Sequence, residues 1–118
     1  MKKKILIWLD DERPIRADIP KGIGYPETCD ILMCKTAEHC IEWLAKHANE
    51  YRIWIAFDHD LEYGKTGYDV AKYIVTNDIA IEGFSCHSMN PSGVKNIVEI
   101  MRHYGYETIK SLGDIYYG

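Results

Sequence analysis

Three short apolar runs in this sequence stop abruptly at acidic or histidine residues, and this pattern restricts the fold more than any other feature. The runs and the clusters that follow them are Lys4–Leu9 before Asp10 and Asp11, Arg52–Phe57 before Asp58, His59 and Asp60, and Ile81–Cys86 before His87 and Ser88. Apolar runs of this length without polar alternation are typical of strands buried on both faces, as in a parallel sheet.

Segments with helical periodicity separate these runs. Thr36 is placed to cap a helix whose apolar positions recur at helical spacing up to Ala48, and Gly67 opens a second helix. The pair Asn90 and Pro91 begins a third helix, with Asn as the cap and Pro in the first turn. Two further strand segments complete the pattern, Asp30–Cys34 and Glu107–Lys110.

Strands that alternate with helices predict an α/β fold with a five-stranded parallel sheet and right-handed crossovers. The 118 residues fit one domain, residues 1–118. Between the first two strands, Arg13–Glu27 contains three prolines and two glycines. A loop is therefore expected there in place of a long helix.

The carboxyl ends of parallel strands meet at one edge of the sheet, where open α/β folds hold their ligands. Asp10, Asp11 and Asp58 all follow such ends, and neighbouring carboxylates repel one another unless a cation lies between them. Acids at strand ends also cap turns or face water, but polar clusters at three equivalent ends favour a site. Because carboxylate oxygens are hard ligands, the sequence predicts a divalent cation on these residues, Mg²⁺ or Mn²⁺ first and Ca²⁺ as a further option, in preference to Zn²⁺.

Two histidines, His59 and His87, follow strand ends beside this acidic cluster. An imidazole can exchange a proton near neutral pH, ligate a metal or donate to a phosphate. A lone histidine is more often a structural hydrogen-bond partner, and for this pair the two interpretations are evenly balanced. Together with Asp58, the two histidines are the candidate catalytic residues.

Candidate ligand-binding residues surround the same edge. The helix start after Ser88 could hold an anion on its backbone N–H groups, although a capped helix with nothing bound has the same sequence. Cations in the loops could clamp a phosphate, although isolated loop cations are more often solvated. The full set is Arg13, Asp60, Lys65, Ser88, Asn90, Ser92 and Gly93.

Composition excludes several classes of function. The formal net charge of −4 provides no basic field for a nucleic-acid backbone, so we expect no binding to duplex DNA. No apolar stretch approaches the length needed to span a membrane, so no membrane association is expected. The four cysteines lack paired or zinc-like spacing, and thiols without disulfides in a cytoplasmic protein are expected.

The order of these motifs resembles the receiver domain of two-component signalling. Asp10 and Asp11 match the paired acids of that family, Asp58 matches the aspartate after its third strand, and Gly67 opens the next helix. The resemblance implies a flavodoxin-like three-layer sandwich with strand order 2-1-3-4-5. It also implies that these acids bind Mg²⁺ and that the third-strand aspartate accepts a phosphoryl group.

The sequence departs from ordinary receivers near its carboxyl end. Ser88 can take the place of the Ser or Thr after strand four, but Lys110 is followed by Ser111 instead of Pro. The first helix is replaced by the proline-rich loop, and the last helix is truncated. We therefore expect that the usual phosphorelay output surface is missing.

The sequence is more similar to the divergent receivers described as cyclic-phosphate-processing receiver domains. The shared motifs are Trp8–Arg13, Asp58–Leu61, Thr66 with Gly67, and His87–Gly93. This resemblance implies binding, and hydrolysis, of a cyclic or terminal phosphate on a nucleotide or RNA end. It places the metal on the three acids, proton transfer on the two histidines, and phosphate contacts on Arg13 and the helix start at Asn90.

Two alternatives stay open beside a metal-dependent cyclic phosphodiesterase. One is a non-catalytic protein that sequesters a cyclic nucleotide, as phage counter-defence proteins do. The other is a degenerate phospho-acceptor receiver. The residue pattern does not separate catalysis from binding, and it leaves the ligand and the oligomeric state open.

Overall fold

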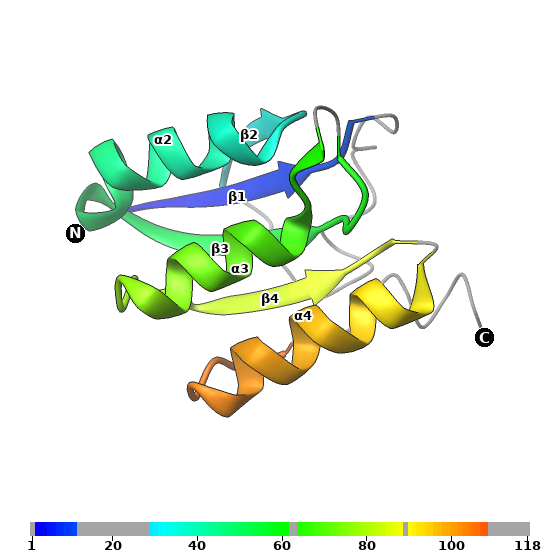
Figure 1. Ribbon diagram of the computed structural model, residues 1–118. Helices are drawn as coiled ribbons and strands as arrows, with labels where there is room; N and C mark the ends of the chain where they lie inside the picture. The colour runs from blue at the N-terminus through cyan, green and yellow to red at the C-terminus, as the bar shows by residue number, and fades with distance from the viewer. Residues whose placement is uncertain (1, 12–28, 62–63, 89, 109–118) are drawn as a thin grey trace.

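The structure, a computed structural model, describes residues 2–11, 29–61, 64–88 and 90–108 (Figure 1). Three expectations concern residues outside these ranges: the loop in place of the first helix, the truncated last helix, and the phosphate contact by Arg13. In the ranges that are described, no helix is long and apolar enough to cross a bilayer.

Strands and helices alternate along the chain as the apolar pattern predicts. The strands are β1 (Lys3–Leu9), β2 (Asp30–Cys34), β3 (Tyr51–Phe57) and β4 (Gly83–Cys86). The helices are α2 (Ala37–His47), the short 3₁₀ helix η1 (Ala48–Glu50), α3 (Gly67–Thr76) and α4 (Pro91–His103). Strand β4 is two residues shorter than predicted, although the Glu82 N–H still donates to the Ile53 carbonyl of β3 at 2.8 Å.

All strands of the described sheet are parallel, and their order is β2-β1-β3-β4 (Figure 1). This order matches the start of the flavodoxin-like order 2-1-3-4-5 and confirms the predicted receiver-type α/β fold. Of the expected fifth strand, Glu107–Lys110, only Glu107 and Thr108 are among the described residues, and Thr108 forms an isolated bridge with Phe84. The prediction of five strands is therefore corrected to four in the described residues. Glu107 and Thr108 are exposed, so little apolar burial extends the pairing.

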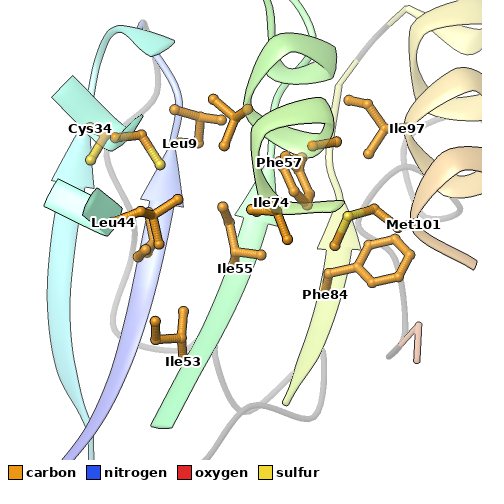
Figure 2. Packing of buried hydrophobic residues seen from close by; sticks show 14 of the residues in the cluster. Leu9, Cys34, Leu44, Ile53, Ile55, Phe57, Ile74, Phe84, Ile97 and Met101 are labelled. Atoms are coloured by element: carbon orange, nitrogen blue, oxygen red, sulfur yellow. The ribbon is translucent and has the colours of Figure 1, made fainter. Parts of the chain in front are cut away.

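One face of the sheet packs against all three described helices and carries the main core. Side chains that are in register on neighbouring strands project to the same face, as Ile7 and Ile55 do. Figure 2 shows such strand residues meeting Leu44 of α2, Ile74 of α3 and Ile97 of α4. Each buried side chain of this size contributes about 1.5–3 kcal/mol, so these contacts hold the helix layer on the sheet.

The alternate residues of the strands reach the opposite face of the sheet and are buried as well. Leu6, Trp8 and Ala56 are at most 2% exposed, yet none of them belongs to the core cluster under the helices. Ala56 is in register with Trp8 on one side and with Ser85 on the other. Because Ala56 and Ser85 are small, the indole ring of Trp8 has room to lie across β3.

Side chains fix the helix starts, as the sequence predicts for two of them. The Thr36 hydroxyl and the Asn90 amide oxygen each accept a hydrogen bond from the backbone N–H three residues further on, at 3.1 and 3.0 Å. At the start of α3, the Asp69 carboxylate accepts from the Thr66 backbone N–H at 2.7 Å. Caps of this kind are worth about 1 kcal/mol each, and they place the helix starts at the edge of the sheet that carries the polar clusters.

None of the four cysteines, all of which lie in the described residues, forms a disulfide, as predicted. Cys34 and Cys40 are fully buried. A hydrogen bond with the Cys34 thiol, together with burial, raises the pKa of the Cys40 thiol well above its ordinary value. Cys40 therefore stays protonated and unreactive at neutral pH.

Gly67 allows α3 to begin directly against the end of β3. Its N–H donates to the His59 carbonyl at 2.8 Å. A β-carbon at this position would collide with the Asp58 carbonyl oxygen and would lie 3.3 Å from Ile97 Cδ1. The close approach of this helix to the strand end therefore requires glycine.

Gly67→Ala should lower the free energy of unfolding by about 1–3 kcal/mol, the usual cost of overpacking a tight site. The gain in helix propensity, about 0.5–1 kcal/mol, is smaller and acts in the opposite direction. Urea denaturation measures the change. The matched control is Ala45→Ser, which also adds one heavy atom but at an exposed position of α2. Equal stability of the two variants would contradict the close contact.

Candidate functional site

The backbone pairing of the sheet continues one residue beyond the strand ends. Three hydrogen bonds do this: from Asp10 N–H to Cys34 O at 3.0 Å, from Asp58 N–H to Leu9 O at 3.0 Å, and from His87 N–H to Phe57 O at 2.9 Å. Trp8 and Ala56 are in register two residues earlier. Because extended residues alternate between faces, Asp10, Asp58 and His87 project from the same face as these two residues.

Asp10, Asp58 and His87 form one buried polar group. Their ligand atoms lie within 4.8 Å of one another, and the residues are only 3%, 7% and 1% exposed. The Nε2 atom of His87 lies 3.0 Å from Asp10 Oδ2, and both side chains are essentially inaccessible. Asp11, which the sequence places with the acids, is half-buried and is not part of this group. The structure thus brings together two of the three predicted metal ligands and one predicted catalytic histidine.

Trp8 holds the His87 ring in a fixed orientation. The two rings are stacked, with centroids 4.1 Å apart and planes only 1° from parallel. Since β3 lies between β1 and β4, this contact spans β3 on the face where Ala56 projects. A larger side chain at position 56 would occupy the space between the two rings and the strand.

A second polar cluster lies beside the buried group and consists of His59, Asp60 and Asn90. His59 Nδ1 is 2.9 Å from Asp60 Oδ1 and 3.3 Å from Asn90 Nδ2. The His59 side chain is 18% exposed and that of Asp60 is 70% exposed, so this cluster is open to solvent. When Nδ1 carries the proton and donates it to Asp60, His59 Nε2 is left as the proton acceptor.

The start of α4 is largely occupied by the protein itself. A β-carbon on Gly93 would collide with the His59 ring, so glycine is needed there for His59 and not for the close approach of a phosphate. Pro91 has no N–H, and the N–H groups of Gly93 and Val94 both donate to Asn90. Few amides at this helix start therefore remain for an anion.

The remaining predicted ligand-binding residues are dispersed. The buried Ser88 hydroxyl accepts from the Asn90 N–H at 3.1 Å and so forms a local turn. Ser92 is exposed at the start of α4. Lys65 is exposed, and its ammonium lies 3.7 Å from Glu38 of α2. Arg13 is outside the described residues.

Sequence reasoning missed Trp8 and Ala56 as parts of the site. Both look like ordinary members of apolar strands. The available signal was the alternation of side chains along the strands. Once β1 and β3 are paired in register, the same face of the sheet carries Trp8, Asp10, Ala56 and Asp58. The single small residue within the bulky run of β3 was the second signal, since it marks space for a large neighbour.

The parallel sheet, its strand order and the acidic strand ends define a receiver-type protein. The model of the family described as the cyclic-phosphate processing receiver domain matches residues 5–103, and this chain belongs to that family. No curated protein matches the chain.

Solved receiver structures share the fold at low sequence identity. The signal receiver domain of a protein described as a Luxo repressor from Vibrio parahaemolyticus has a TM-score of 0.62 and 19% identity, covering 90% of this chain and 75% of its own. The response regulator domain of Thermotoga maritima CheB has a TM-score of 0.59 and 16% identity, with coverages of 92% and 78%. A receiver protein from Pseudomonas putida has a TM-score of 0.57 and 13% identity, with coverages of 99% and 95%.

Ala56→Leu should disrupt the stack between Trp8 and His87 and lower the free energy of unfolding by about 1–3 kcal/mol, because the added atoms overpack a filled space. Near-UV circular dichroism should change as the indole loses its fixed partner, and urea denaturation gives the stability. Ala80→Leu, at an exposed position, is the control. The packing described here is wrong if both variants keep the spectrum and stability of the parent.

Proposed function

We propose that this chain binds a cyclic or terminal phosphate on a nucleotide or RNA end and hydrolyses it with the help of a divalent ion. The observation that carries the proposal is the buried group of Asp10, Asp58 and His87 at the carboxyl ends of neighbouring strands, with the more accessible His59 beside it. Membership in a family described as cyclic-phosphate processing supports the same substrate class.

The buried group is compact enough for its members to be candidate ligands of one ion. Two ligands on opposite sides of one ion lie about 4.2 Å apart for Mg²⁺ and about 4.6–5.2 Å apart for Ca²⁺, and ligands in adjacent positions lie closer together. The ligand atoms of Asp10, Asp58 and His87 lie within 4.8 Å of one another. Two close, buried carboxylates also favour positive charge between them. An ion bound there would polarise a phosphoryl oxygen and offset the charge that builds on the phosphate.

His59 is the better placed of the two histidines for proton transfer with a substrate. Its side chain is 18% exposed, whereas that of His87 is 1% exposed and stacked on Trp8. With Nδ1 directed to Asp60, Nε2 takes a proton from the attacking water as the new phosphorus–oxygen bond forms. The same nitrogen then returns a proton to the alkoxide that leaves when the ring bond breaks. The product is a phosphomonoester.

The phosphate itself would be held mainly by side chains near the start of α4, since few backbone amides remain there. Ser92 is exposed there, and we propose that Arg13 and Lys65 supply the cations, as the sequence predicts. Arg13 suits this role because its guanidinium matches two phosphate oxygens at once. Asp60 acts through His59, from whose Nδ1–H it accepts, and the Asn90 amide donates to the same Asp60 oxygen at 3.5 Å.

Binding without turnover is the second candidate, and the burial of the site favours it. Asp58 is 7% exposed, and the Asp10 and His87 side chains at most 1%, so a ligand has little access to the buried group unless the surrounding chain moves. Such a protein would sequester a cyclic nucleotide and release it unchanged.

The proposal predicts that the protein, with Mg²⁺ or Mn²⁺ present, converts 2′,3′-cyclic mononucleotides or cyclic-phosphate RNA ends to monophosphates. Liquid chromatography measures the product. His59→Ala should lower kcat by about a hundredfold to ten-thousandfold, the usual loss for a general acid–base, with little change in ligand affinity. His39→Ala, exposed on α2 and outside both clusters, is the control. Tight binding without product would favour sequestration. If the protein shows no binding and forms no product, both candidates are refuted.

Acetyl phosphate should not label Asp58 stoichiometrically. The reason is that Asp58 is 7% exposed beside His87, and that Lys110 lacks the following Pro of ordinary receivers. Intact-mass spectrometry of the protein and of Asp58→Asn measures the labelling. Full labelling that disappears in the variant would instead indicate a phospho-acceptor receiver.

A further inference from the structure

The buried group differs in donor chemistry from the three carboxylates that the sequence predicts. The ligand atoms that the fold brings together are two carboxylate oxygens, from Asp10 and Asp58, and one imidazole nitrogen, from His87. Asp11 is the neighbour of Asp10 but lies outside the group. An imidazole therefore stands where a third carboxylate is expected.

We propose that His87 is a protein ligand of the divalent ion through Nε2, and that the pocket consequently selects a transition ion of the Mn²⁺ or Zn²⁺ class over Mg²⁺ and Ca²⁺. This inference rests on the divalent ion of the proposed function, but it does not depend on turnover.

The distance between Nε2 and the neighbouring carboxylate fits shared coordination. Two adjacent ligands at right angles on one ion, each about 2.1 Å from it, lie about 3.0 Å apart. His87 Nε2 and Asp10 Oδ2 are 3.0 Å apart. Asp58 belongs to the same group, with a carboxylate oxygen within 4.8 Å of both atoms, and is the third candidate ligand.

The His87 ring is prepared for this role by contacts that are independent of the carboxylates. Its backbone N–H is bound to the Phe57 carbonyl at 2.9 Å, and its ring plane is set by the stack on Trp8. Burial at 1% exposure keeps bulk water from the ring. A ligand held in one orientation loses little conformational entropy when an ion binds.

The choice of ion follows from the nitrogen donor. Mg²⁺ and Ca²⁺ prefer oxygen ligands, and Mg²⁺ gives up its water reluctantly. Imidazole suits Zn²⁺ and the other first-row transition ions, which bind mixed nitrogen and oxygen sites more tightly. Replacing one carboxylate by imidazole also makes the site less negative, which weakens ions that are bound mainly by charge.

The test is isothermal titration calorimetry of chelator-treated protein with Mn²⁺, Zn²⁺, Mg²⁺ and Ca²⁺ separately. Mn²⁺ and Zn²⁺ should bind at least about tenfold more tightly than Mg²⁺. His87→Asn should weaken Mn²⁺ and Zn²⁺ binding by at least about tenfold, the smallest usual loss for a mere outer-shell partner of a ligand, while changing Mg²⁺ binding less. The control is His47→Asn, which removes the exposed histidine 2.9 Å from Glu50 and reports adventitious binding to a surface pair.

Pulsed electron paramagnetic resonance of Mn²⁺ bound to the unaltered protein gives a second measurement, which does not depend on whether a variant folds. A ¹⁴N coupling from one imidazole is expected. Tighter binding of Mg²⁺ than of Mn²⁺, or Mn²⁺ bound without nitrogen coupling, would overturn the inference. A nitrogen-coupled site that turns over none of the cyclic phosphates would leave the inference standing and refute hydrolysis. Turnover with Mg²⁺ and no nitrogen coupling would refute the inference and support hydrolysis.

Discussion

The register of the parallel sheet is the constraint on which the site depends. Asp10, Asp58 and His87 each continue the backbone pairing of their strands by one residue, so hydrogen bonds between main chains align their side chains. Side chains alternate between the two faces of a sheet, and a slip of one residue would move each of them to the other face. The apolar rows that face the helices prevent such a slip, because it would also expose the core. Hydrophobic burial at Ile7 and Ile55 thus sets the positions of polar groups at the strand ends.

The polar residues fall into a buried tier and an accessible tier, and the difference has electrostatic consequences. Asp10 and His87 are shielded from water, so charges there interact strongly and are costly to leave unbalanced. His59, Asp60 and Asn90 lie closer to solvent, where charges are screened and protons exchange readily. A binding site for an ion needs the first environment, and proton transfer to a substrate needs the second. The two tiers meet where Asp58 and His59 adjoin in the sequence.

Features determined by nearby residues were predictable from the sequence, and features determined by pairing were not. The apolar runs gave the strands, and Thr36 and Asn90 gave two helix starts, because each depends on a few neighbouring residues. The membership of the buried group depends on which residues share a face once β1, β3 and β4 are paired. That is why His87 joins Asp10 while Asp11 does not.

Gly93 was open to misinterpretation for a related reason. A glycine at a helix start is commonly associated with an approaching phosphate, and only the folded chain reveals that the His59 ring takes up the space. For the expected fifth strand, the sequence pattern does not tell whether exposed residues such as Thr108 gain enough burial to pair with β4 beyond the bridge that the described residues form.

The contact between His59 and Gly93 couples the position of the end of β3 to that of the beginning of α4. The ring lies where a side chain of the helix would otherwise be, and the Asn90 amide holds both the ring and the first turn. The ring cannot swing toward the helix without pushing it, and the helix cannot tilt inward without displacing the ring. Over the 13 residues of α4, a small rotation at this contact becomes a larger displacement at His103. A shift of the His59 ring would therefore require α4 to shift with it.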